Sequence, residues 1–221
     1  MGSELPGAAA ALGDLDPHNL VRALIQGVLP NGTSVLRHPS PNIMFTRDLG
    51  VIVGQARLLT FAAKPARRRE MRLSRALMRH HPVFGDGPLL DISQHVASPA
   101  LEGGDVLVLS ADQVAIGVGA RTDERSARAA AALLHSTGVS EVHLVKLRAS
   151  RATMHLDTVF TLIDDAHCLA FGPLVTQKSA AQVTTLQSNG SESQRTGSLL
   201  DVLAESGLPL TPIYCGDAHP I

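Results

Sequence analysis

Four segments of the chain repeat apolar residues at the spacing of a helix with one buried face. The first places Leu20, Leu24 and Ile25 on one stripe. The third begins at Thr122, a plausible N-cap, and stops at Gly138, a residue suited to a helix C-terminus. The predicted helices cover residues 17–29, 66–81, 122–138 and 198–207.

Shorter apolar runs between the helices predict β-strands. Two runs separated by a polar turn give a hairpin pattern over residues 103–119. The other strands are predicted at residues 43–48, 50–54, 141–147, 153–163, 168–172 and 208–216. Two polar stretches, residues 30–42 and 176–196, are predicted to be a loop and a surface excursion.

The order of these elements favours an α/β fold in which hairpins are interleaved with helices. A doubly wound Rossmann sheet would instead alternate single parallel strands with helices. The chain also has no G-x-G-x-x-G and no G-x-x-x-x-G-K-[ST] motif, so a nucleotide-binding function is not indicated.

Composition and charge further limit the class of protein and the partners that can be expected. The 221 residues are 44% hydrophobic, which is enough for a sizeable core, and the formal net charge is −1. That charge balance gives no reason to expect nucleic acid or an anionic membrane as a partner. No signal peptide or transmembrane segment is visible, so a soluble, cytoplasmic protein is expected. The two cysteines, Cys168 and Cys215, make neither a disulfide framework nor a metal-ligand cluster, and no cofactor is predicted.

Polar residues that could carry chemistry stand at the edges of predicted strands. They are Asp48, Glu102 with Asp105, Arg121, and His155 with Asp157. Each alone has an ordinary structural explanation: a turn aspartate, a glycine-rich hairpin start, a solvated arginine, or a satisfied buried pair.

His155 and Asp157 are two residues apart in a run that has the pattern of a strand, so both are expected on one face. Carboxylates, a histidine and an arginine converge only if the strands are arranged around an axis. Converging carboxylates suit a guanidinium, which offers five N–H donors in a planar fork.

The motifs "PNIMFTRD", "LEGGDVLVL", "GARTDERS" and "MHLDTVFTLID", together with "PARRRE" and "HHPVF", resemble those of arginine deiminase, a member of the guanidine-modifying or pentein superfamily. The resemblance runs from about residue 42 to the end of the chain. It implies an α/β propeller of ββαβ units around a central site, here incomplete and with several of the units. It also implies a division into an N-terminal helix and loop, 1–41, and a partial pentein catalytic domain, 42–221.

The resemblance assigns roles to four residues at the centre. Asp48 and Asp157 would hold the substrate guanidinium between them. His155 would be the general acid/base, since an imidazole can give and take a proton near neutral pH. Glu102 would orient His155 and stabilise its charged form.

Four further residues would recognise the rest of the substrate. Arg67 and Arg121 match the arginines that bind the substrate α-carboxylate, and Asn42 and Phe45 match residues lining the pocket. The implied partner is a small molecule, L-arginine, and the implied reaction is its hydrolysis to citrulline and ammonia in arginine catabolism. No metal ligand is implied.

The family mechanism needs a cysteine thiolate in a Gly- and Arg-rich loop near the C-terminus, and this chain has no such loop. Cys168 and Cys215 are interpreted as structural. The chain therefore resembles the middle of an arginine deiminase, and alone it is expected to be inactive. Two alternatives stay open: an arginine deiminase or fragment of one, and a non-catalytic pentein that binds arginine or a protein partner. A homo-oligomer and a related guanidine substrate are not decided by the sequence.

Overall fold

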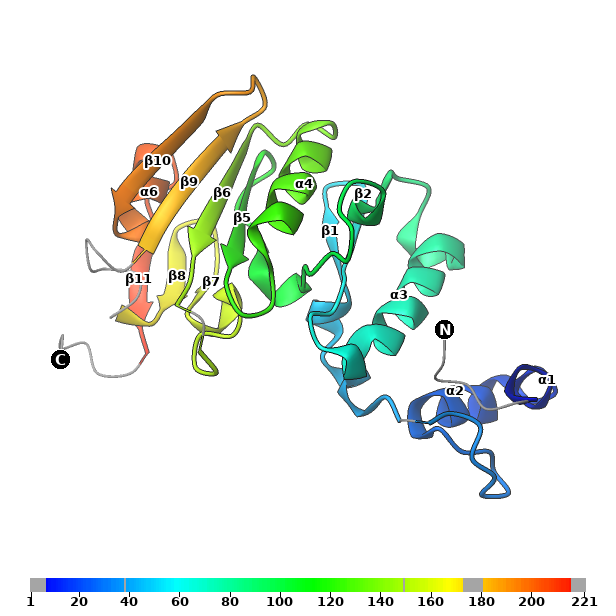
Figure 1. The fold of residues 1–221 in the computed structure, drawn as a ribbon. Coiled ribbons are helices and arrows are strands. Elements are labelled where there is room, and N and C mark those ends of the chain that lie inside the picture. Colours follow the sequence, from blue (N-terminus) through cyan, green and yellow to red (C-terminus); the bar gives the residue numbers. More distant parts are fainter. Residues whose placement is uncertain (1–6, 38, 149, 173–180, 216–221) are drawn as a thin grey trace.

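The computed structural model describes residues 7–37, 39–148, 150–172 and 181–215 of the chain (Figure 1). This part is a mixed α/β structure with three β-sheets. None of its helices combines the length and the apolarity that crossing a membrane requires.

The apolar periodicity predicts four of the described α-helices but not the first one, at residues 8–13. The α-helices are α1 (Ala8–Gly13), α2 (Pro17–Gln26), α3 (Arg68–His80), α4 (Glu124–His135) and α6 (Leu199–Glu205). Short 3₁₀ helices lie between them: η1 (Pro41–Met44), η2 (Thr46–Leu49), η3 (Pro65–Arg67), η4 (Pro82–Phe84), η5 (Ile92–Gln94), η6 (Gly103–Asp105) and η7 (Leu156–Thr158). The predicted N-cap Thr122 is wrong, because the Asp123 carboxylate caps α4 by accepting from the amide of Ser126 at 2.8 Å.

The strands form one five-stranded and two three-stranded sheets. They are β1 (Gly50–Val53), β2 (Ala56–Leu59), β3 (Leu89–Leu90), β4 (Val106–Val108), β5 (Gln113–Val118), β6 (Glu141–Lys146), β7 (Phe160–Leu162), β8 (His167–Ala170), β9 (Ala181–Gln187), β10 (Glu192–Gly197) and β11 (Thr211–Tyr214). The central sheet has the order β10-β9-β6-β5-β4.

One pattern of pairing recurs three times, and it defines three units. Unit 1 is β1, β2, α3 and β3; unit 2 is β4, β5, α4 and β6; unit 3 is β7, β8, α6 and β11. In each unit the first two strands pair antiparallel and the second and last strands pair parallel. The β9–β10 hairpin is added to unit 2 through antiparallel pairing of β9 with β6. The predicted ββαβ organisation is therefore confirmed, and the described strands do not close into a barrel.

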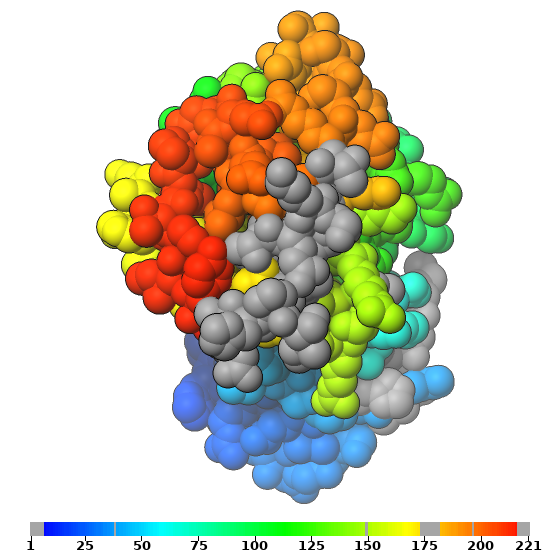
Figure 2. Space-filling view, turned by 90° about the vertical axis from the view of Figure 1, so that its left-hand side faces the viewer, coloured from blue at the N-terminus to red at the C-terminus, as the bar shows by residue number. Residues whose placement is uncertain are grey.

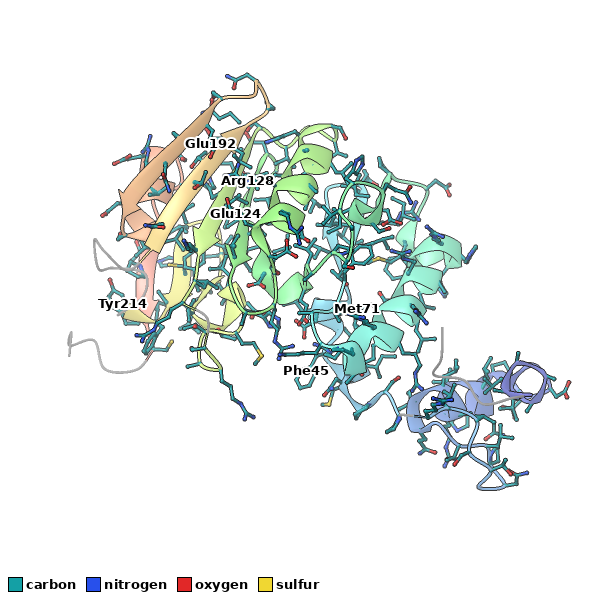
Figure 3. All side chains as sticks on the ribbon, in the orientation of Figure 1. Phe45, Met71, Glu124, Arg128, Glu192 and Tyr214 are labelled. Atoms are coloured by element: carbon teal, nitrogen blue, oxygen red, sulfur yellow. The ribbon has the colours of Figure 1, made fainter. Side chains whose placement is uncertain are left out.

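Strands β5 and β6 of the central sheet are buried on both faces because their side chains alternate between two cores. Val114 and Ile116 of β5 pack with α4 and unit 1, whereas Ala115 packs with unit 3, including its helix α6, on the other side. Arg128 of α4 also reaches β10, donating to both carboxylate oxygens of Glu192 at 3.0 Å (Figure 3).

The predicted strand at residues 43–48 is wrong. The chain instead forms η1 and η2, in which Phe45 N–H bonds to Asn42 O and Asp48 N–H bonds to Phe45 O. An alternating strand would bury every second side chain, but Met44 and Phe45 are 74% and 54% exposed. The tight turns bring Asp48 into the interior directly before β1.

The predicted strand at residues 153–163 begins only at Phe160. Before it, the Thr158 hydroxyl donates to the carbonyl of His155 at 2.6 Å, and residues 156–158 form η7. Such side-chain bonds to the local backbone compete with a sheet ladder. His155 and Asp157 therefore do not share a strand face, and that premise of the sequence prediction is wrong.

The predicted polar excursion at residues 176–196 is also wrong where the structure describes it. Residues 181–187 and 192–197 form the β9–β10 hairpin, while residues 176–180 lie outside the described part of the chain. The turn contains Asn189-Gly190 with Gly190 at φ 85°, a common hairpin signal. Figure 2 shows the hairpin tip (orange) and the N-terminal segment (blue) at opposite ends of the molecule.

The N-terminal helices have a small core of their own. Ala8, Val35 and Leu36 are buried there, apart from the two cores of the sheets. Arg69 of α3 connects this segment to unit 1, donating to Leu24 O at 3.1 Å and to Ser40 Oγ at 2.6 Å. A domain boundary between residues 41 and 42 stays a prediction.

Candidate active site

A 3₁₀ helix stands directly before the first strand of each unit, and we call these three segments the leading turns. They are η2 before β1, η6 before β4 and η7 before β7. Asp48 lies in η2, Glu102 is the N-cap of η6, and His155 is the N-cap of η7. Three distant parts of the sequence therefore deliver polar side chains from the turns that lead into the first strands of the units.

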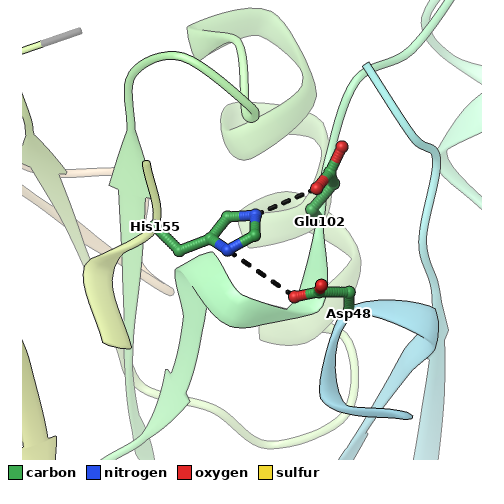
Figure 4. A group of neighbouring side chains, drawn as sticks. All are labelled: Asp48, Glu102 and His155. Atoms are coloured by element: carbon green, nitrogen blue, oxygen red, sulfur yellow. Dashed lines mark hydrogen bonds and ion pairs between the residues drawn. The ribbon is translucent and has the colours of Figure 1, made fainter. Parts of the chain in front are cut away.

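The three side chains converge on one another (Figure 4). His155 Nε2 lies 2.9 Å from Glu102 Oε2, and His155 Nδ1 lies 3.6 Å from Asp48 Oδ1. The first distance is a hydrogen bond, while the second is an ion-pair distance. Glu102 is fully buried, and Asp48 and His155 are 7% and 6% exposed.

The two glycines of "EGGD" are there because of space, not because of a left-handed backbone. A Cβ on Gly103 would lie 2.0 Å from the carbonyl oxygen of Arg47. A Cβ on Gly104 would lie 2.8 Å from both Asp48 Oδ1 and His155 Nδ1. Neither glycine has a positive φ, so the simpler explanation of a hairpin start that needs φ > 0 is wrong. The glycines let the leading turns of units 1, 2 and 3 approach closely.

The electrostatics of this cluster favour a charged pair of Glu102 and His155. Burial lowers the pKa of His155, but the hydrogen bond to Glu102 and the charges of Asp105 and Asp48 raise it above its ordinary value. Burial would raise the pKa of Glu102, but the His155 hydrogen bond and the Arg121 charge lower it. Each group thus stabilises the ionised form of the other.

The arginines assigned to carboxylate recognition both contact carboxylates of the chain itself. Arg67 is 8% exposed, and its NH1 lies 2.6 Å from Asp48 Oδ2 and 3.8 Å from Glu102 Oε2. Its Nε donates to Glu70 Oε2 at 3.0 Å. Arg121 NH1 lies 3.3 Å from Glu102 Oε2. A guanidinium is therefore already held between the carboxylates of this cluster.

The remaining predicted site residues lie around this centre. Asp157 is half-buried and pairs with Arg47 at 3.0 Å rather than with the Asp48 cluster. Burial raises the pKa of Asp157, and Arg47 and His155 oppose that rise only in part. Asn42 contributes its backbone, with its amide donating to Glu70 at 3.1 Å and its carbonyl accepting from Arg67 at 3.3 Å. Phe45 is exposed (Figure 3).

Two functional contacts were not foreseen from the sequence. Glu70 is fully buried and pairs with Arg67, although it stands in an arginine-rich helix. Thr122 Oγ1 donates to Asp105 Oδ2 at 2.6 Å instead of capping α4. An acidic residue on the apolar side of a basic helix was the one available signal for Glu70.

The ligating atoms of Asp48, Glu102 and His155 lie within 4.8 Å of one another, which is close enough to hold a metal ion. Arg67 and Arg121, however, already lie against the same carboxylates. Any incoming cation, a metal ion included, would have to compete with these guanidinium groups for the carboxylates.

Residues 22–208 match the family model described as arginine deiminase. The arginine deiminase of Listeria welshimeri is 34% identical over 151 residues, covering 67% of this chain and 37% of that protein. The arginine deiminase of Rhodococcus erythropolis is 34% identical over 200 residues, covering 82% of this chain and 48% of that protein. The chain thus spans less than half the length of either relative.

Solved structures share the fold. A dimethylarginine dimethylaminohydrolase adduct with 4-chloro-2-hydroxymethylpyridine aligns with a TM-score of 0.52 at 20% identity, over 79% of this chain and 56% of that one. DDAH from Pseudomonas aeruginosa, a cysteine-to-serine mutant complexed with citrulline, aligns with a TM-score of 0.50 at 20% identity, over 79% of this chain and 70% of that one. At such identities the likeness concerns the fold alone, and it confirms the predicted pentein-type α/β architecture. Since the family model matches most of its length, the chain belongs to the arginine deiminase family.

Proposed function

We propose that this chain carries the part of an arginine deiminase site that holds the guanidinium and transfers protons. The carrying observation is that buried carboxylates of Asp48 and Glu102 already surround a guanidinium, that of Arg67, next to His155. A substrate guanidinium bound at Asp48 would take the place of the Arg67 group, which would then be free to meet the substrate carboxylate. Asp157, in the leading turn of unit 3, would be the second carboxylate that binds the substrate guanidinium.

In the proposed reaction a cysteine thiolate attacks the guanidinium carbon of L-arginine. His155, charged beside Glu102, gives a proton to the leaving nitrogen, and ammonia departs. A water then attacks the thiouronium carbon while the neutral His155 takes its proton. The carbon–sulfur bond then breaks while the hydroxyl group of the intermediate loses its proton to solvent, so that citrulline is released and the thiolate is regenerated.

We further propose that neither cysteine of the chain is this nucleophile. Cys168 is fully buried in β8, and burial raises the pKa of its thiol, which disfavours the thiolate. Cys215 follows β11, and its Sγ lies 3.6 Å from the carbonyl of Ala170. Its neighbour Tyr214 lies well apart from Phe45 in Figure 3. On this proposal the 221 residues alone do not deiminate arginine.

The test is to express residues 1–221, incubate them with L-arginine and measure citrulline colorimetrically, in parallel with Cys215→Ser. We expect no citrulline from either protein. Citrulline formation that disappears in Cys215→Ser would contradict the proposal and make Cys215 the nucleophile. Binding of arginine, measured by calorimetry, should in contrast be detectable and should be weakened by Asp48→Asn.

The second candidate function is a non-catalytic pentein that binds arginine or a protein partner. The burial of Cys168 in β8, which disfavours its thiolate, is the observation that favours it. A protein that extends this chain to the length of its relatives separates the two functions. There, His155→Ala should abolish citrulline formation if the protein is an enzyme, while a binder would form no citrulline even before the substitution.

A further inference from the structure

Asp105 is a buried carboxylate for which the proposed reaction has no direct use. It is 1% exposed and is the last residue of η6, directly before β4. Its Oδ1 accepts from the backbone amide of Leu156 at 2.9 Å, and its Oδ2 accepts from the hydroxyl of Thr122 at 2.6 Å. Both oxygens are therefore occupied by donors of the chain.

These two contacts lie on either side of the hydrogen bond between Glu102 and His155. Thr122 Oγ1 accepts from the backbone amide of Glu102 at 3.2 Å while donating to Asp105. Leu156 directly follows His155 in the chain. The hydrogen bonds form a closed loop that runs from Glu102 through Thr122 and Asp105 to Leu156, and back through the side chains of His155 and Glu102.

The surroundings leave Asp105 little freedom to move. A Cβ on Gly117 of β5 would lie 2.5 Å from Asp105 Oδ1 and 2.9 Å from the Cβ of Leu156. The backbone of β5 at Gly117 therefore packs directly against the Asp105 carboxylate and against Leu156 of η7. A buried carboxylate with two fixed donors and no room to rotate holds both donors in place.

We infer that Asp105 is a positioning residue that fixes the Glu102–His155 pair, by holding Thr122 on one side and the backbone after His155 on the other. The inference rests on the proposed function, because His155 is the acid/base of that reaction. The direct influence of Asp105 on His155 is electrostatic. In the proposed reaction Asp105 contacts neither the substrate nor the reacting atoms.

Charge and hydrogen bonding can be separated experimentally. Around His155, the negative groups are Asp48 in η2, Glu102 and Asp105 at η6 and Asp157 in η7, and the positive groups are Arg67, Arg121 and Arg47. Removing the charge of Asp105 should move the titration of His155 to lower pH. Removing only the Thr122 hydroxyl leaves that charge in place but opens the loop.

The experiment compares four variants of the 221-residue chain by NMR: Asp105→Asn, Thr122→Val, Thr122→Ser and, as a control, the exposed Asp165→Asn. The signals are the pH titration of the His155 ring carbon and the exchange with water of its Nε2 proton. In Thr122→Val and Asp105→Asn, that exchange should accelerate roughly tenfold or more, since a charged hydrogen bond loses its alignment. Thr122→Ser and Asp165→Asn should behave like the wild type.

Unchanged exchange and titration of His155 in both Asp105→Asn and Thr122→Val would overturn the inference. If Asp105→Asn does not fold, the comparison of Thr122→Val with Thr122→Ser decides alone. Valine replaces the hydroxyl by a methyl group, whereas serine keeps the hydroxyl and lacks the methyl group. Arginine binding by the wild-type chain is measured in the same samples. Failure to bind arginine would speak against the proposed function, whereas the His155 signals judge the role of Asp105 independently.

Discussion

Replacing Asp105 by asparagine should change how the stability of the fold depends on pH. Burial raises the pKa of Asp105 to about 7 from an ordinary value of 3.8, while the hydrogen bond from Thr122 and the charge of His155 oppose that rise. The folded-state pKa is thus above the unfolded one. The stabilisation from a neutral Asp105 is fully present below pH 3.8 and is lost as the pH rises through about 7.

The magnitude follows from the difference between these two pKa values. At 1.36 kcal/mol per pH unit, it corresponds to about 4 kcal/mol in total, of which about 2.5 kcal/mol falls between pH 5 and pH 8. Asparagine does not titrate, so this loss is absent from the variant. The free energy of unfolding of Asp105→Asn minus that of the wild type should therefore be about 2.5 kcal/mol larger at pH 8 than at pH 5, so the variant gains in relative stability as the pH rises.

The assay is urea unfolding of both proteins at pH 5 and pH 8. His155 titrates in the same range and feels the charge of Asp105, so the comparison is repeated in a His155→Gln background. The pH-dependent difference should persist in that background. A difference between the two proteins that is the same at both pH values, within about 0.5 kcal/mol, would refute the claim that Asp105 is ionised at a cost in the folded protein.

Three further predictions concern other residues. Gly117→Ala should lower the free energy of unfolding by about 1–3 kcal/mol in a urea titration, because its Cβ would overlap Asp105, whereas Gly197→Ala, with open space around it, should not show this loss. Burial lowers the pKa of His143 below 6.5, so the stabilisation from its neutral form is present at pH 8 and is lost as the pH falls below 6.5. A His143→Gln variant should therefore lose less stability between pH 8 and pH 5 than the wild type. An equal loss would contradict this. Arg121→Ala should weaken arginine binding roughly tenfold to a hundredfold in calorimetry but affect agmatine, which lacks the α-carboxylate, far less, and equal losses would show that Arg121 does not recognise the carboxylate.

Helices α2, α3, α4 and α6 and most of the described strands could be predicted because their apolar periodicity is local and is preserved in the structure, whereas α1 was missed. The conformation of residues 153–159, before β7, could not be predicted. Their alternating pattern is typical of a strand, but hydrogen bonds to other parts of the chain and to the local backbone fix a different conformation. The amide of Leu156 goes to Asp105, and the hydroxyl of Thr158 goes to the carbonyl of His155. The β9–β10 hairpin was missed for the opposite reason, since Val183 is buried but most of its neighbours are polar.

The candidate site was predictable as a set of residues but not as a geometry. Motif resemblance named Asp48, Glu102 and His155, and the structure brings these three together. No sequence pattern indicates that Arg67 lies against Asp48, because that contact depends on how α3 packs beside η2. The pairing of Asp157 with Arg47 likewise arises from two leading turns meeting in space.

The leading turns also bear on how the units of this fold depend on one another. Each unit has its own sheet and helix, yet buried polar groups at its leading turn also contact a group of another unit. Glu102 of unit 2 needs His155 of unit 3, and so does Asp48 of unit 1. Separating unit 3 would remove the imidazole from both carboxylates and leave Asp48 with Arg67 and Glu102 with Arg121. Losing one partner of a buried charge is destabilising. The same side chains that prepare the site for chemistry thus make the units unfold together, so local opening of one unit carries an energetic penalty that its own sheet could not impose.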